Sequence, residues 1–310
     1  MHGNDSSKRE KEMDGYKKII RNQDTRMKIL KMLSFVPDRM MIKLQYRIKL
    51  HRKLNLKKPE RYTEKIQWYK LHYRNPIMTQ CVDKYAVRDY IKDRGLSDCL
   101  TRLYGAYDSA DEIDFDKFPE KFIIKTTNGS GTNIICRDRK KFDREKAKQE
   151  LESYMNRPQI SAGREWAYYN VQPKIVVEEL LIDPKAPDGD INDYKFICFS
   201  GKVYCIVVDI DRHVNHRRNF YSTKWERINA CSDHENFSPD VPKPENFDEM
   251  IRVAEKLSSP FPHVRVDLYN IAGKIYFGEL TFYPWSGYVQ YTPDSFDYDL
   301  GNSFVLQESK

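Results

Sequence analysis

The feature of this sequence that most constrains its fold is a series of short apolar runs that begins near residue 121. The runs are rich in β-branched and aromatic residues and are bounded by Gly, Asn, Asp or Pro, which is typical of β-strands. They are KFIIK, NIIC, KIVVEELLI, YKFICF, VYCIVVDI, HVRVDLY and KIYFGELTF. Between the second and third runs, residues 142–157 have the pattern of a surface helix. Strands and helices without regular alternation predict an α+β fold, not a doubly wound one.

The residues before this series have a helical pattern. Apolar residues recur at steps of three or four from Leu30 to Ile48, and Pro37 interrupts them, which predicts two helices. Residues 1–60 carry 17 Lys and Arg against 7 Asp and Glu, whereas the other 250 residues carry 36 against 39. The net charge of +7 is therefore an N-terminal feature, and we expect no nucleic-acid partner.

This basic segment allows two interpretations. It forms a helical layer on the core with a solvated basic face, which we favour, or it makes a peripheral contact with the inner face of a membrane. No run approaches the roughly 20 apolar residues of a spanning helix, and the polar start lacks the apolar core of a secretory signal. We therefore expect a cytoplasmic protein. Its six cysteines form no CxxC pair, which predicts reduced structural thiols.

The turn between the first two runs, TTNGSGT, contains Gly129 and Gly131. Small residues let backbone N–H groups approach phosphate oxygens, and Lys125 at the end of the first run adds a positive charge. Neither a Walker GK[ST] pattern nor a GxGxxG that opens a helix is present. Taken alone, the turn fits either a phosphate-binding loop or a plain hairpin connection.

The last two runs bring charged residues onto one strand face. Alternation places Arg265 and Asp267 on the same side of their strand. We expect a three-residue loop, 271–273, which would place Glu279 opposite Arg265 and diagonal to Asp267. In that register Phe277 shares the face of Glu279.

Two covered carboxylates need a partner to stay ionised. A structural ion pair with Arg265 is one interpretation, and a divalent cation is the other. We favour magnesium, because it takes few protein carboxylates and completes its shell with nucleotide phosphates and water. The hairpin and the glycine turn would then form one site.

The order of these motifs resembles the ATP-grasp superfamily, and more closely its TupA-like branch, which is associated with bacterial surface polysaccharide and teichuronopeptide synthesis. The resemblance covers nearly the whole chain from about Leu54. It is carried, in order, by LNLKKPERYTEKIQWYKLHYRNP, DKYAVRDYI, FPEKFIIKTTNGSGTNI, GREWAYYN, VVEELL, DYKFICFSGKV, VRVDLYN and YFGELTFYPWSG.

The resemblance implies an ATP-grasp fold, in which two α+β lobes hold ATP between them, preceded by a helical N-terminal region. Four parts are expected on this basis. They are a basic helical region (1–60), a helical segment (61–120), a lobe with the glycine-rich phosphate loop (121–182) and a lobe with the metal-binding hairpin (183–310).

The resemblance also implies roles for particular residues. ATP phosphates and adenine would be bound by Lys84, Lys125, the loop Asn128, Gly129, Ser130, Gly131 and Thr132, and the segment Glu178, Glu179, Leu180 and Leu181. The ribose would be held by Asp183 or Asp193, between which the spacing does not choose. The magnesium ligands would be Asp267, Glu279 and Thr281, with Arg265 and Lys195 as catalytic cations at the transferred phosphate. At Thr281 the chain departs from the Asn that many ATP-grasp enzymes have.

The activity implied by the resemblance is ATP- and Mg²⁺-dependent carboxylate–amine ligation through an acyl phosphate. The carboxylate would belong to a uronic acid of a surface polysaccharide or of its nucleotide- or lipid-linked precursor, and the amine to an amino acid or amino alcohol. No side-chain nucleophile is needed, and neither GxSxG nor HExxH occurs.

Substrate contacts can be sought by residue chemistry, because aromatic rings suit sugar faces and arginines suit carboxylates or phosphates. The candidates are Arg164, Trp166, Tyr168, Arg212, His213, His216, Arg217 and Arg218. Three other functions stay open: a kinase of a sugar or lipid-linked glycan, a glycosyltransferase, and a non-enzymatic adaptor that binds membrane or RNA through residues 1–60.

Overall fold

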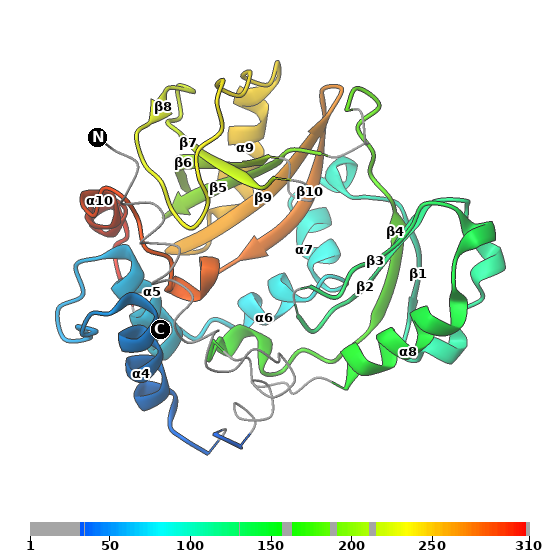
Figure 1. The fold of residues 1–310 in the computed structure, drawn as a ribbon, viewed down its shortest axis with the longest axis horizontal. Helices are drawn as coiled ribbons and strands as arrows, with labels where there is room; N and C mark the ends of the chain where they lie inside the picture. Colours follow the sequence, from blue (N-terminus) through cyan, green and yellow to red (C-terminus); the bar gives the residue numbers. More distant parts are fainter. Residues whose placement is uncertain are drawn as a thin grey trace.

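The computed structural model describes residues 32–33, 35–129, 131–156, 163–186, 191–210 and 215–307. They form two antiparallel sheets with helices around and between them (Figure 1). The predicted α+β class is confirmed. Within the described residues Cys81, Cys99, Cys136, Cys198 and Cys205 are buried free thiols, as expected for reduced structural cysteines.

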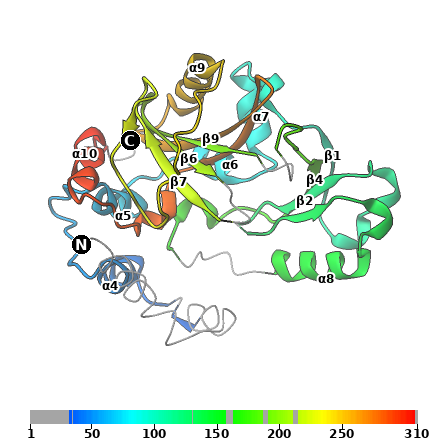
Figure 2. The same cartoon turned by 45° about the horizontal axis from the view of Figure 1, so that its top comes forward.

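The smaller sheet has four strands in the order β1-β4-β2-β3. They are β1 (Leu103–Tyr107), β2 (Phe122–Thr126), β3 (Ile134–Cys136) and β4 (Ile175–Glu179). Alternate residues of β2 and β4, such as Phe122 and Val177, are fully buried, and Leu151 of α8 (Arg144–Met155) joins their apolar cluster. Figure 2 shows α8 alongside this sheet.

Strand β1 lies in the segment that was expected to be helical. Its sequence, LYGAY, has no β-branched residue and is only half-buried throughout. Pairing with β4, more than 60 residues away in the chain, determines its conformation, and local propensity gives no signal for such a strand.

The larger sheet has six strands in the order β10-β9-β5-β6-β7-β8. They are β5 (Asp193–Phe199), β6 (Lys202–Ile210), β7 (Arg217–Tyr221), β8 (Arg227–Ile228), β9 (His263–Ile271) and β10 (Lys274–Thr281). Strands β7 and β8 lie outside the apolar runs that predict strands. They are short and rich in arginine, and β7 is a strand because it pairs with β6.

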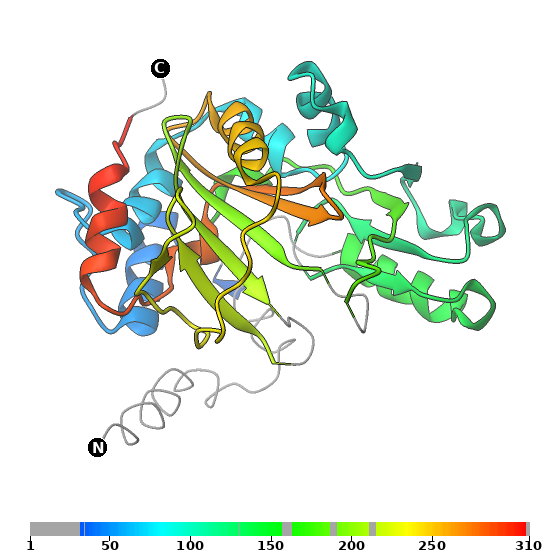
Figure 3. The same ribbon diagram turned by 90° about the horizontal axis from the view of Figure 1, so that it is seen from above.

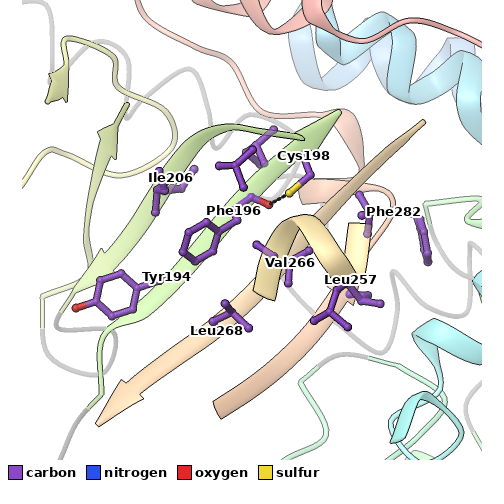
Figure 4. Close-up of a cluster of buried hydrophobic side chains, with 14 of the residues drawn as sticks. Tyr194, Phe196, Cys198, Ile206, Leu257, Val266, Leu268 and Phe282 are labelled. Carbon is purple, nitrogen blue, oxygen red and sulfur yellow. Dashed lines mark hydrogen bonds between the residues drawn. The ribbon is translucent and has the colours of Figure 1, made fainter. Parts of the chain in front are cut away.

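One face of the larger sheet is apolar and packs on α9 (Phe247–Ser258). Phe196 pairs with Val266 and Tyr194 with Leu268, and Figure 4 shows these side chains together with Leu257 of α9. The buried residues of α9, among them Met250, Val253 and Leu257, lie on one side of the helix, and this side packs on the apolar face of the sheet. Because strand residues alternate, the residues between those named point to the opposite face.

Two helices cover one end of that opposite face. Tyr62 of α5 (Tyr62–His72) packs edge-on to His263 of β9, and its hydroxyl lies 3.0 Å from His263 Nε2. Helix α10 (Ser295–Ser303) is joined to α5 through Asp297, which accepts hydrogen bonds from the backbone and hydroxyl of Thr63 at 3.0 and 2.8 Å. Figure 3 shows α10, in red, at the margin of the molecule.

Further helices connect the lobes and the N-terminal region. Helices α6 (Pro76–Val82) and α7 (Val87–Asp93) lie between the two sheets (Figure 1). Helix α4 (Asp38–Leu50) begins directly after Pro37, as the sequence predicts. Its buried Ile42 and Tyr46 pack near Trp68 of α5, so this part of the N-terminal region forms a helical layer on the core. The expected helix before Pro37 lies largely outside the described residues.

The turn of the β9–β10 hairpin differs from the predicted one. Lys274 pairs with Ile271, so the turn holds two residues, Ala272 and Gly273, with φ of 50° and 81°. Two-residue turns with positive φ match the twist of the flanking strands. The predicted three-residue loop is therefore wrong.

A bulge then corrects the register. Phe277 pairs with Leu268, but Glu279 pairs with Asp267, so Gly278 is an extra residue in β10. The bulge moves Glu279 to the face of Asp267 and leaves Phe277 on the opposite face. The shared face of the two carboxylates is confirmed, whereas the shared face with Phe277 is wrong, because strict alternation does not hold through a bulge.

Candidate active site

A cavity of about 330 Å³ opens between the two sheets. Charged side chains reach it from both sides. From the side of the four-stranded sheet it is lined by Lys84, Arg88, Lys125 and Glu178, and from the six-stranded sheet by Asp193, Lys195, Asp209, Arg218, Arg265, Asp267 and Glu279. The structure thus gathers both predicted motifs around one space.

One carboxylate holds two cations at the four-stranded sheet. Glu178 of β4 accepts a bond from Lys125 Nζ at 2.8 Å and another from Arg88 Nη1 at 2.9 Å. Arg88 also donates to the carbonyl oxygen of Thr101 at 2.7 Å. Sequence reasoning missed Arg88, although it lies four residues after Lys84 in a motif that had been singled out.

Lys84 joins the glycine turn to its strand. Its ammonium group donates to the carbonyl oxygens of Thr126, at 3.1 Å, and Gly129. Burial lowers the pKa of Lys84 to about 8, although the Glu279 carboxylate acts in the opposite direction. A lysine held by carbonyl groups rather than by a close carboxylate is well suited to receive an anion.

The glycine turn presents its backbone to the cavity. Gly129 and Gly131 line it, and a Cβ atom added at either would meet nothing within 4 Å. The side chains of Asn128 and Thr132 instead donate to backbone carbonyls of their own lobe, at 3.2 and 3.4 Å. Ser130 lies outside the described residues.

The charged face of the larger sheet is built by cross-strand pairing. Side chains that are directly paired on antiparallel strands share a face and lie close together. Two adjacent rows result, Glu279–Asp267–Lys195 across β10, β9 and β5, and Asp193–Asp209–Arg218 across β5, β6 and β7.

Lys195 lies at the centre of this face. Its ammonium group contacts Asp193, and it lies 3.2 Å from Asp267 Oδ2 and 3.5 Å from Asp209 Oδ2. Burial by itself would lower the pKa of Lys195, but Asp193 and Asp267 raise it above its ordinary value. Lys195 is therefore a permanent cation.

Arg265 binds both carboxylates of the hairpin. It donates to Asp267 at 2.6 and 2.7 Å and to Glu279 Oε1 at 2.8 Å. Thr281, not Glu279, lies directly opposite Arg265, which corrects the predicted pairing. Partial desolvation inside the cavity would raise the pKa of Glu279, but Arg265 and Lys195 hold it below its usual value, so the carboxyl group is ionised.

The hairpin carboxylates fit a magnesium site that is shared with a nucleotide. The Glu279 side chain is 47% exposed, toward the cavity, whereas that of Asp267 is 3% exposed. Within the described ranges no group of three or more His, Cys, Asp or Glu is arranged to hold a metal by itself. Magnesium does not need one, because it binds through one or two carboxylates plus phosphates. Thr281 donates to Glu279 Oε1 at 3.0 Å and so orients that carboxylate.

Asp209 and Trp285 are site residues that the sequence did not reveal. Asp209 accepts a bond from Arg218 Nε at 2.6 Å and lies 3.1 Å from His216 Nε2. Burial would raise its pKa, but Arg218 holds it well below the usual range. The Trp285 ring lies 4.8 Å from Arg218 Cζ and 5.3 Å from Arg265 Cζ. A bulge in the β5–β6 pairing shifts the register, so the pairing of Asp209 with Asp193 could not be predicted from the sequence.

Trp285 belongs to a strained loop after β10. Trp285, Ser286 and Gly287 all have positive φ, of 48°, 56° and 66°. Helix α5 supports this conformation, because Gln67 donates to the carbonyls of Ser286 and Gly287 at 3.0 and 2.9 Å and Lys70 donates to Ser286 O at 2.8 Å. Strain that is held this firmly is typical of functional sites.

Of the other predicted nucleotide contacts, Asp193 lines the cavity, whereas Asp183, Glu179, Leu180 and Leu181 do not. Asp183 instead caps a turn by accepting from the backbone N–H of Lys185 at 2.9 Å. Glu179, Leu180 and Leu181 follow Glu178 along the edge where β4 leaves the sheet and are half-buried.

The predicted substrate contacts separate into two groups. Tyr168, His216 and Arg218 line the cavity. The others lie elsewhere: Arg164 is bound to Asp38 at 3.0 Å, Trp166 faces Arg74, and Arg217 is paired with Glu235. Arg212 and His213 lie outside the described residues.

Solved structures of ligases show a distant likeness to this chain. D-alanine–D-alanine ligase from Bacillus anthracis bound to ATP has 15% identity, with 77% of this chain and 70% of that chain covered, and a TM-score of 0.40. A second structure of that ligase has 16% identity and a TM-score of 0.38, and covers 65% of this chain and 57% of that one. L-amino acid ligase from Bacillus licheniformis has 15% identity and a TM-score of 0.42, with 69% and 44% covered. The chain therefore spans about half of the length of some of these proteins.

The family match is more extensive. No curated protein sequence matches the chain. The family model described as TupA-like ATPgrasp matches residues 64–305, well over half of the chain. The protein therefore belongs to the TupA-like ATP-grasp family, as the resemblance of its motifs predicts.

Proposed function

We propose that this protein is an ADP-forming carboxylate–amine ligase. The observation that supports this best is the cavity itself, where two lysines and an arginine from one lobe face the carboxyl groups of Asp267 and Glu279 from the other. The negative charge of a polyphosphate would be attracted by the lysines and the arginine, and its magnesium ion would be held by Asp267 and Glu279. When bound, magnesium neutralises phosphate charge.

The nucleotide would be bound mainly by the four-stranded lobe. Lys84 and Lys125 would bind phosphate oxygens together with the backbone of the glycine turn, as in other anion-binding loops. We add Arg88 to this group, because it lines the cavity beside Lys125. The adenine would lie along residues 178–181. For the ribose we favour Asp193 over Asp183, because Asp193 lines the cavity.

The reaction would proceed in two steps. An oxygen of the substrate carboxylate attacks the γ-phosphorus of ATP, which forms an acyl phosphate and releases ADP. The amine nitrogen then attacks the acyl carbon, inorganic phosphate leaves, and the nitrogen loses a proton to give the amide. Arg265 and Lys195 are permanent cations on the same face, and they would stabilise charge on the transferred phosphoryl group.

The acceptor would be a uronic acid of a bacterial surface polysaccharide or of its nucleotide- or lipid-linked precursor, in the cytoplasm. The resemblance to the TupA-like branch suggests this class. Tyr168, His216 and Arg218 line the cavity and offer an aromatic ring and cations to such a ligand.

An ADP-release screen of uronic acids against amines tests this proposal. The expected result is ADP release that needs both substrates and is lost in Glu279→Gln. Hydroxylamine added in place of the amine should trap a hydroxamate, because it reacts with an acyl phosphate. ADP release with a stable phosphate monoester and no hydroxamate would instead indicate a kinase, and release of a nucleoside diphosphate from a nucleotide sugar would indicate a glycosyltransferase.

A further inference from the structure

The outer face of α4 carries an unusual group of exposed apolar residues. Nine large hydrophobic side chains are exposed among the described residues, and five of them lie between residues 32 and 48. They are Met32 (74%), Phe35 (81%), Met40 (63%), Leu44 (53%) and Ile48 (44%). Isolated exposed apolar residues are ordinary, but a continuous group indicates a contact surface.

The helix geometry places three of these residues in one row. Met40, Leu44 and Ile48 follow one another at steps of four, so they lie along one side of α4. At 100° per residue this row is opposite Ile42 and Tyr46, which are fully buried against the core. Helix α4 thus has two apolar sides, and only the inner one is covered by described residues.

A basic row runs beside the apolar one. Arg39, Lys43 and Arg47 are exposed and also follow at steps of four. Residues 38–58 contain eight Lys and Arg and a single acidic residue, Asp38. Asp38 is paired with Arg164, and Arg52 and Lys58 are paired with Asp294 and Glu60. The exposed row Arg39, Lys43 and Arg47 therefore carries positive charge on the outer side of α4.

The segment before α4 is fixed to the body of the protein. Arg164, which is 4% exposed, donates to the carbonyl oxygens of Leu33 and Val36 at 2.7 and 3.1 Å. Phe35 lies between these two anchored residues and is 81% exposed. Its exposure is therefore built into the structure. This contact also gives Arg164 a structural role away from the cavity.

From these observations we infer that the outer face of α4 binds an anionic lipid surface. An apolar row beside a basic row is the arrangement of a helix that lies in the membrane interface, where the apolar side chains enter the acyl boundary and the cations meet lipid phosphates. A symmetric contact between two copies would bring the same basic rows together, which disfavours self-association. In the described part of the chain no helix is both long and apolar enough to cross a bilayer. Figure 2 shows α4 at the edge of the molecule, on the outside of α5.

Sedimentation of the full-length protein with lipid vesicles tests this inference, independently of the proposed reaction. We expect binding to vesicles of phosphatidylcholine mixed with phosphatidylglycerol, little binding to phosphatidylcholine alone, and weaker binding in high salt. Combining Met40→Ser, Leu44→Ser and Ile48→Ser should lower the partition coefficient at least about tenfold. Combining Lys43→Gln and Arg47→Gln should lower it about tenfold on mixed vesicles.

A matched triple variant controls for the loss of exposed apolar side chains in general. Ile77, Ile135 and Val305 are exposed elsewhere, and replacing all three with Ser should leave vesicle binding unchanged. Circular dichroism of each variant would show that it folds. Absence of binding to the mixed vesicles, or equal binding by the α4 variants, overturns the inference. A wild-type dimer that the α4 triple variant converts to a monomer would show that this face contacts a second copy instead.

Discussion

The two sides of the cavity handle charge differently. The four-stranded lobe brings three cations and one carboxylate, Glu178, whereas the six-stranded sheet brings three cations and four carboxylates. The first side therefore has spare positive charge for an anion. The second side is nearly neutral by itself and has a surplus carboxylate that suits a cation. A nucleotide polyphosphate with its metal is the ligand that matches both.

The two buried lysines show the same contrast. Lys84 has carbonyl oxygens as its hydrogen-bond partners, and burial lowers its pKa to about 8. Lys195 is equally buried but has three carboxylates within reach, and its pKa is raised. Partners, rather than burial, decide the direction of the shift. Lys84 should therefore serve ligand binding with little effect on stability, whereas Lys195, besides its proposed role at the transferred phosphate, should also stabilise the fold.

The largest expected effect is on the metal side of the cavity. In Glu279→Gln, magnesium-dependent ADP release should fall about a thousandfold, because the metal loses a charged ligand. The side chain is half-exposed, so folding should be retained. Glu255→Gln, which removes a carboxylate paired with Lys202 on the surface, is the matched control and should keep full activity. Near-normal activity of Glu279→Gln would show that Glu279 is not a ligand of the proposed magnesium ion.

Replacing the two lysines would separate ligand binding from stability. Lys195→Met leaves three buried carboxylates facing one another, which should cost about 3–5 kcal/mol of unfolding free energy in urea titrations. Lys84→Met should weaken ATP binding about 10- to 100-fold in calorimetry with little loss of stability. If both variants were destabilised equally, the contrast between the two sides would be wrong.

The sequence predicted those strands whose own residues have the composition of a β-strand. Strands β2, β4, β5, β6, β9 and β10 follow from β-branched and aromatic runs between turn residues. Strand β1 and strand β7 lack such runs and exist through pairing with distant partners. Local pattern therefore predicts strands with buried faces and misses those defined by their neighbours in the sheet.

The site shows the same limit. Asp267 and Glu279 were placed on one face, but by a three-residue turn where the protein uses a two-residue turn and a bulge. Lys125 and Arg265 were singled out by the residue pattern and Lys84 by the resemblance, and the structure brings all three around the cavity. The positions of Asp209 and Trp285 in the site are determined by a second bulge and by a strained loop, respectively. Neither feature can be recognised in a single sequence.

The pKa of Lys84 predicts how ATP binding depends on pH. Phosphate oxygens favour the charged lysine, so the pKa of Lys84 rises when ATP binds and binding takes up a proton above about pH 8. The affinity should be constant well below pH 8 and fall by up to about tenfold per pH unit above it. Calorimetry across this range checks the profile, which Lys84→Gln should flatten. An unchanged profile in the variant would assign the dependence to another group.

The smallest expected effect tests the bulge that brings the carboxylates together. A Cβ atom at Gly278 would lie 3.0 Å from Asp267 O and 3.2 Å from Tyr269 Cε2, so Gly278→Ala must shift the strand that carries Glu279 by a few tenths of an ångström. Turnover should fall a fewfold to about tenfold, because the metal site is misplaced, while ATP binding without magnesium stays unchanged. Gly273→Ala, in the turn of the same hairpin, has open space but a φ of 81°, so it should cost about 1 kcal/mol of stability and leave turnover intact. If the turn variant lost turnover and the bulge variant did not, Glu279 would be positioned by the turn and not by the bulge.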